Sequence, residues 1–155
     1  MDIAIIGIAG RFPEAGNLDG FYRNLAAGRD SVRPFSRARL RNTGIPTAEE
    51  YEIFGYLEDI DLFDHEFFNI SLGEAQHMDP HQRLILEVVY ETFENAGYNP
   101  DFFLGTRTAV FVGDVTLAYS RHANRVEPTL TTGNLHPITA GRIARTFDLR
   151  GGALM

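Results

Sequence analysis

Histidines are the first residues in this sequence whose type and spacing could do chemistry. His77 and His81 stand four residues apart, a spacing that on a single helix would give both imidazoles to one metal ion. Asp79-Pro80 lies between them and predicts the start of a new helix, so the two histidines are not expected to share one. No third ligand stands at a fixed spacing from them. A structural or capping role is therefore the preferred interpretation.

Carboxylates and hydroxyls offer two other chemistries. The acidic stretch over residues 59–66 could hold a carboxylate pair for acid–base catalysis, although an acidic loop at the rim of a domain is its ordinary explanation. The candidate nucleophilic serines are Ser31, Ser36, Ser71 and Ser120. None of them stands in a G-x-S-x-G sequence, so a hydrolase triad is unsupported. The chain has no Cys and no Lys, which removes thiolate nucleophiles, thiolate metal sites, disulfides and Schiff-base amines.

A glycine-rich turn after an apolar run invites a dinucleotide-binding interpretation. That fingerprint needs three glycines, for a tight turn, a close approach to the pyrophosphate and close helix packing. In the segment that begins at Gly7, Ala9 occupies the second glycine position and Phe12 the third. Because Phe12 is too bulky for close helix packing, the preferred interpretation is a core strand that leaves through a glycine-rich turn.

Apolar runs and helix-start signals predict the elements around these residues. Residues 3–8 and 108–112 are continuous apolar runs, typical of strands buried on both faces of a parallel or mixed sheet. Helices are predicted over 17–28, 71–78, 80–96 and 137–147, of which three begin at the caps Asn17, Ser71 and Asp79. The helix over 80–96 is apolar nearly all round, which predicts that it is buried.

Other segments predict less regular structure. Residues 29–50 are predicted to form a long solvent-exposed loop with little regular structure. This loop carries a cluster of arginines that either form local ion pairs or bind an anion. The arginines are Arg29, Arg33, Arg37, Arg39 and Arg41. Residues 54–57 fit a short strand, and the composition of residues 131–134 fits a loop. The apolar run that begins at Ala153 reads either as a last strand or as a strand cut partway along its length.

Composition restricts the classes of function. The 155 residues are 44% hydrophobic and carry a net charge of −7, which argues against binding to nucleic acid. No apolar run reaches the 18 residues that would suggest a membrane span. An acid at position 2 stands where a signal peptide has basic charge. We therefore expect a cytoplasmic protein with no nucleic-acid or membrane partner.

Taken together, these segments resemble the ketosynthase (β-ketoacyl synthase) domains of modular polyketide synthases. The resemblance covers nearly the whole chain, and the ordered set of motifs is more specific than any one of them. The matching blocks are residues 3–13, 57–64, 67–71, 74–75, 78–84, 94–98, 106–108, 110–113, 132–134, 141–144 and 147–151.

The resemblance implies an α/β fold of the thiolase-like type, an αβαβα sandwich, in a domain that forms homodimers. Residues 1–155 would be the incomplete N-terminal part of the first half, truncated before the nucleophile strand is complete. The family performs a decarboxylative Claisen condensation in polyketide and fatty acid biosynthesis. Its substrates are acyl and malonyl-type units on acyl carrier proteins, so the implied partner is an acyl carrier protein that presents phosphopantetheine. The resemblance implies no directly bound cofactor.

The resemblance assigns no catalytic, cofactor-binding or metal-binding residue to this chain. The family's nucleophilic Cys would follow a few residues after the position of Met155, and the histidines present match none of its catalytic motifs. The segment Thr131, Thr132, Gly133 and Asn134 resembles a region near the acyl pocket or the dimer interface. The chain alone is expected to be inactive, as part of an acyltransferase. The alternative is a non-catalytic remnant that dimerises or binds a carrier protein.

Overall fold

A computed structural model describes residues 2–36, 53–113 and 128–155. The chain forms two compact units: one is Ala9–Ile60, and the other combines Met1–Ile8 with Asp61–Met155. In the described residues, no helix has both the length and the apolar character needed to cross a membrane.

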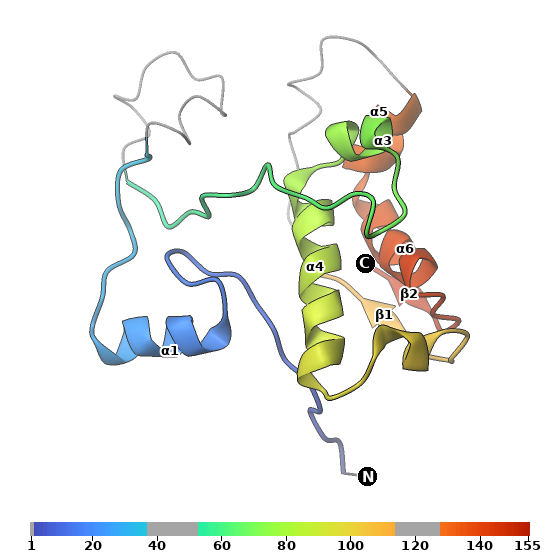
Figure 1. The fold of residues 1–155 in the computed structure, drawn as a ribbon, viewed down its shortest axis with the longest axis horizontal. Coiled ribbons are helices and arrows are strands. Elements are labelled where there is room, and N and C mark those ends of the chain that lie inside the picture. Colours follow the sequence, from blue (N-terminus) through green and yellow to red (C-terminus); the bar gives the residue numbers. More distant parts are fainter. Residues whose placement is uncertain (1, 37–52, 114–127) are drawn as a thin grey trace. The chain divides into compact units, whose positions relative to one another are not determined.

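The smaller unit contains the helix α1 (Leu18–Ala26) (Figure 1). The side chain of Asn17 accepts a hydrogen bond from the backbone N–H of Gly20 at 2.9 Å, which confirms the expected cap. Gly28 has a φ of +63° just after the helix, a conformation that glycine adopts without strain. The strand predicted over residues 54–57 is wrong, because the backbone there makes only an isolated antiparallel bridge between Arg33 and Phe54.

The larger unit holds the remaining helices of the described residues. They are α3 (Leu72–His77), α4 (Pro80–Asn95), the short 3₁₀ helix η2 (Pro100–Phe103), α5 (Pro128–Asn134) and α6 (His136–Thr146). The predicted starts of α3 and α4 are confirmed. Ser71 Oγ accepts from the N–H of Glu74 at 3.2 Å, and Asp79 Oδ1 accepts from the N–H of His81 at 2.9 Å. These caps satisfy donors that the first turn of a helix leaves unpaired.

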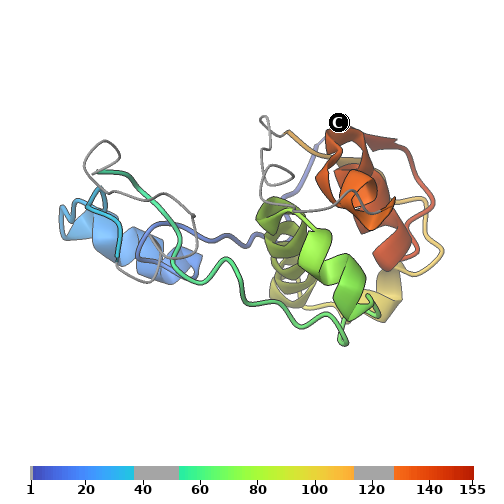
Figure 2. The ribbon, with the colours of Figure 1, turned by 90° about the horizontal axis from the view of Figure 1, so that it is seen from above.

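Two short strands form a parallel pair in this unit. β1 (Val110–Phe111) and β2 (Ala153–Leu154) pair with Val110 opposite Ala153 and Phe111 opposite Leu154. The run predicted over 108–112 is therefore a strand, although a shorter one, and the run that begins at Ala153 is a strand as well. The helix α6 packs against both strands and against α4, and the two helices lie side by side in both views (Figures 1 and 2).

The strand predicted over residues 3–8 is wrong for this structure. Ile3 and Ile5 are 90% and 86% exposed, and the sheet of the described residues consists of β1 and β2 alone. The end of the segment instead lies against the end of α4: Ile8 N–H donates to Asn95 Oδ1 at 3.0 Å, and a Cβ at Gly7 would come within 2.8 Å of Ala96 Cβ. Without a neighbouring strand to pair its backbone, an apolar run cannot join a sheet.

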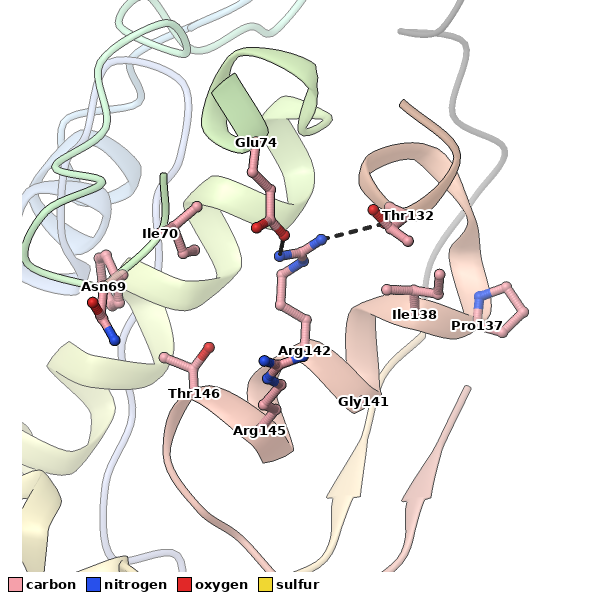
Figure 3. A pocket seen from close by; sticks show the side chains of 11 residues that line it. Asn69, Ile70, Glu74, Thr132, Pro137, Ile138, Gly141, Arg142, Arg145 and Thr146 are labelled. Atoms are coloured by element: carbon pink, nitrogen blue, oxygen red, sulfur yellow. Dashed lines mark hydrogen bonds and ion pairs between the residues drawn. The ribbon is translucent and has the colours of Figure 1, made fainter. Parts of the chain in front are cut away.

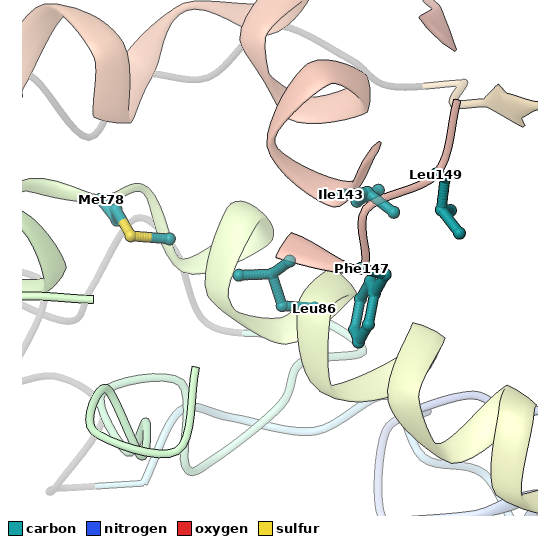
Figure 4. Close-up of a cluster of buried hydrophobic side chains, with 5 residues drawn as sticks. All are labelled: Met78, Leu86, Ile143, Phe147 and Leu149. Atoms are coloured by element: carbon teal, nitrogen blue, oxygen red, sulfur yellow. The ribbon is translucent and has the colours of Figure 1, made fainter. Parts of the chain in front are cut away.

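The core lies between α4, α6 and the segment that follows α6. Its buried members are Met78, Leu86, Ile143, Phe147 and Leu149 (Figure 4). The prediction that α4 is buried nearly all round is wrong, since its buried residues are Gln82, Arg83 and Leu86 and its other apolar side chains are half-buried. The helix buries one stripe, as a helix packed on one side does.

Candidate functional site

The histidines lie on different helices, as the Asp79-Pro80 signal predicts. His77 ends α3 and His81 lies in the first turn of α4. The Nδ1 atom of His77 is 2.7 Å from Thr129 Oγ1, which gives it a structural partner on α5. In the part of the chain that the structure describes, no three His, Cys, Asp or Glu side chains gather in a group that could hold a metal ion.

Two of the candidate serines and one acid of the stretch 59–66 have local structural roles. Ser71 caps α3, and Ser36 Oγ donates to Glu58 at 2.8 Å. Asp64 Oδ1 accepts from the backbone N–H of Phe67 at 3.0 Å. Ser120 lies outside the described residues. Arg33 also donates to the Glu58 carboxylate, at 2.9 Å, so the carboxylate beside Ser36 belongs to an ion pair.

The segment Thr131 to Asn134 forms the end of α5, so the loop expected from its composition is wrong. Tertiary contacts hold it in place at the junction of α3 and α4. The carbonyl of Gly133 accepts from the N–H of Asp79 at 2.9 Å, and Asn134 Nδ2 donates to the carbonyl of His77 at 2.8 Å. A Cβ at Gly133 would lie only 2.9 Å from the carbonyl carbon of His77. The helix can approach this closely because the residue there is glycine.

Arg142 on α6 connects this segment to the rest of the site. Its Nη1 donates to Glu74 Oε1 on α3 at 2.5 Å and its Nε donates to Gln82 Oε1 on α4 at 2.8 Å. Its Nη2 points to the carbonyl of Thr132 on α5 at 3.4 Å, as Figure 3 shows. The Arg142 side chain is 11% exposed and that of Glu74 is 32% exposed. One guanidinium therefore joins four helices at one point.

The network explains why two side chains do not complete their capping boxes. Glu74 and Gln82 stand at the third position of their helices, where a carboxylate or amide can reach back to the cap residue. Both bind Arg142 instead. This role of Arg142 could not be identified from the sequence, because the residues involved are 60 and 68 positions apart and no local spacing reports such contacts.

A cavity of about 550 Å³ lies beside Arg142, within the larger unit. Its polar lining includes Thr132, Arg142 and Arg145, and its apolar lining includes Phe68 and Ile138 (Figure 3). Of the segment 131–134, only Thr132 lines this cavity. This volume is in the range of pockets that hold small molecules.

The smaller unit has a separate charged cluster around Glu58. Arg33 Nη2 donates to Glu58 Oε1 at 2.9 Å, and Arg33 Nε lies 3.0 Å from Glu14. Arg29 also pairs with Glu14, at 2.7 Å. Local ion pairs are thus confirmed for Arg29 and Arg33, while Arg37, Arg39 and Arg41 lie outside the described residues. The hydrogen bond from Ser36 and then that from Arg33 hold the pKa of Glu58 below its ordinary value.

We expect Ser36→Ala to raise the pKa of Glu58 toward its ordinary value, because the substitution removes the hydrogen bond that lowers this pKa most. A lowered pKa contributes stability that is present above the ordinary value of 4.5 and is lost as the pH falls through the folded-state pKa. An NMR titration of the Glu58 carboxyl carbon measures the shift. Ser31→Ala is the control, and an unchanged Glu58 pKa in Ser36→Ala would contradict the assignment.

Known proteins resemble this chain over its whole length. The family model for the beta-ketoacyl synthase N-terminal domain matches residues 1–155. The chain is 36% identical over 159 residues to the non-reducing polyketide synthase Preu3 of Preussia isomera, covering 99% of this chain and 6% of that protein. It is 37% identical over 166 residues to a phenolphthiocerol/phthiocerol polyketide synthase protein of Mycobacterium tuberculosis, covering 98% of this chain and 11% of that protein.

Solved structures agree with these sequence matches. A ketosynthase from module 6 of the bacillaene synthase of Bacillus subtilis superposes with a TM-score of 0.80 at 33% identity. Ketosynthase twelve from the bacillaene polyketide synthase of Bacillus amyloliquefaciens superposes with a TM-score of 0.76 at 28% identity. Each comparison covers 97% of this chain, which spans 25% and 28% of those two chains. The chain thus spans about a tenth or less of the two polyketide synthases and about a quarter of the solved ketosynthases.

Proposed function

The chain belongs to the β-ketoacyl synthase family, with which it shares the N-terminal domain over residues 1–155, and from that membership we propose that it forms part of a polyketide-type ketosynthase. Its fold is accordingly part of the thiolase-like α/β fold. The observation that carries the proposal is the superposition of nearly the whole chain on a solved ketosynthase at 33% identity.

The proposed activity is the decarboxylative Claisen condensation of acyl and malonyl-type units carried on acyl carrier proteins. In this reaction a cysteine thiolate accepts the acyl group from the phosphopantetheine arm of the carrier protein. Histidines then promote decarboxylation of the extender unit and stabilise the oxyanion that develops. Since these 155 residues include no Cys, the nucleophile must come from residues other than these.

We assign a scaffolding role to the residues present. The support is the Arg142 network, which joins α3, α4, α5 and α6 without leaving a nucleophile beside a base. In this proposal the segment Thr131 to Asn134 faces the acyl pocket or the partner subunit of a homodimer. The tight docking of Gly133 on His77 supports a fixed position for that segment.

Sequencing the coding DNA and the transcript across the codon for Met155 tests the proposal. We expect the frame to continue into a motif that bears a Cys, followed by motifs that bear His. The protein that this frame encodes should then take an acyl group from an acyl thioester, seen as a mass increase of the intact protein, whereas residues 1–155 alone should not. A stop codon directly after Met155 would contradict the proposal and favour the non-catalytic alternative, a module for dimerisation or carrier-protein binding.

A further inference from the structure

The charges that line the cavity beside α6 do not balance. Its charged lining residues are Glu74, Arg142 and Arg145, that is, one carboxylate and two guanidinium groups. The carboxylate of Glu74 is already paired with Arg142. Among residues 2–36, 53–113 and 128–155, the side chain of Arg145 has no hydrogen bond, ion pair or ring contact. One positive charge of the lining is therefore left over, on Arg145, which is exposed.

The remaining lining determines what kind of anion would fit. Phe68, Ile70, Pro137 and Ile138 form apolar walls beside the guanidinium groups. The Phe68 ring stacks on the ring of Phe63, with ring centroids 5.2 Å apart, which holds it in position. Pockets of this kind bind ligands through apolar contact and use a few polar groups to orient them.

We infer that this cavity binds a carboxylate carried on a short aliphatic chain. Arg145 would form the bidentate pair with the carboxylate, for which a planar guanidinium is suited. The aliphatic chain would lie against Phe68 and Ile138. Arg142 lines the cavity but does not pair with the ligand, because its Nε and Nη1 atoms already donate to Gln82 and Glu74. This inference does not depend on the proposed condensing activity.

The test is a titration of the full 155-residue chain with hexanoate, followed by NMR of the backbone amides. We expect shifts at Arg145 and Thr146 that saturate, with a Kd of about 1 mM, as suits a ligand of this size. Hexanamide has the same chain without the charge and should bind about tenfold more weakly. Inorganic phosphate has charge without a chain, and it should also bind more weakly than hexanoate.

Variants assign the binding to the cavity. Arg145→Gln should weaken hexanoate binding by about tenfold or more, since it removes a charge-assisted hydrogen bond. Arg107→Gln changes the net charge equally at an exposed residue that does not line the cavity, and it should bind hexanoate as the unmodified chain does. Circular dichroism spectra of both variants check that they are folded.

Several outcomes would overturn the inference. No saturable hexanoate shift would do so, and so would equal affinities for hexanoate and hexanamide. A preference for phosphate would show that the apolar walls have no part in binding, and equal losses in Arg145→Gln and Arg107→Gln would show binding outside the cavity. None of these results bears on the sequencing and acyl-transfer test of the proposed function.

Discussion

Gly151→Ala is expected to lower the free energy of unfolding by about 3 kcal/mol or more, the upper end of what overpacking costs. A Cβ at this position would lie 2.5 Å from the carbonyl carbon of Thr108 and 2.6 Å from the backbone N of Ala109. Both atoms belong to the backbone that leads into β1, and the N–H of Gly151 donates to the Thr108 carbonyl at 3.0 Å. Because backbone atoms cannot rotate away, the two strands must move apart.

Gly152→Ala is the matched control, one residue further along the chain. No atom lies within 4 Å of a Cβ at Gly152. An alanine there should change stability by less than about 1 kcal/mol, in the stabilising direction, because it restricts the unfolded chain. Urea denaturation followed by circular dichroism measures both variants. If Gly151→Ala were as stable as the unmodified chain, the backbone at Thr108 and Ala109 would be able to move away from residue 151 at little cost, and the prediction would be wrong.

Arg142→Gln is expected to lower the free energy of unfolding by about 2–4 kcal/mol, as does the removal of one partner from a largely buried ion pair. The substitution leaves Glu74 without its cation and leaves the fully buried Gln82 side chain without the donor to its Oε1 atom. Arg142→Lys should not recover the lost stability, because a single ammonium group cannot reproduce the planar set of donors of a guanidinium group.

Hydrogen exchange distinguishes a specific effect of Arg142 from a general loss of stability. We expect the amides of α5 to exchange faster in Arg142→Gln by a larger factor than those of α1, which lies in the other unit. Arg107→Gln, with the same change in net charge at an exposed residue, should stay within about 0.5 kcal/mol of the unmodified chain. If both variants lose the same stability, the network does not hold α5 on the α3–α4 junction.

The starts of α1, α3 and α4 were predictable from the sequence because the interactions that set them are local. The side chains of Asn17, Ser71 and Asp79 each reach a backbone N–H two or three residues ahead. Such contacts form whenever the helix forms, whatever packs around it. The family was recognisable for a different reason, since its motifs occur in order along the whole chain, and the match over residues 1–155 confirms it.

Contacts between distant residues were not predictable in this way. Glu74 and Gln82 stand at the third position of their helices, where a side chain can reach back to the cap residue. Both instead accept hydrogen bonds from Arg142, which lies on a separate helix. Residues 131–134 had the composition of a loop, yet docking on His77 keeps them helical. For Glu74 and Gln82, a local preference worth a few tenths to about 1 kcal/mol was outweighed by partly buried, charge-assisted contacts of about 1.5–3 kcal/mol each. For residues 131–134, the contacts are neutral hydrogen bonds of about 0.5–1.5 kcal/mol each, made where Gly133 comes close to His77.

The sequence by itself determined the family, the starts of α1, α3 and α4 and the absence of a cysteine nucleophile from these residues, because each depends on residue identity or on near neighbours. Only the tertiary structure decided that Ile3 and Ile5 are exposed and that Arg142 joins four helices beside a cavity. The same holds for Arg145 in the lining of that cavity, whose side chain has no partner among the described residues. Burial and charge pairing depend on which distant segments meet. An apolar run therefore predicts a strand correctly only where a partner strand is present, as β2 is for β1.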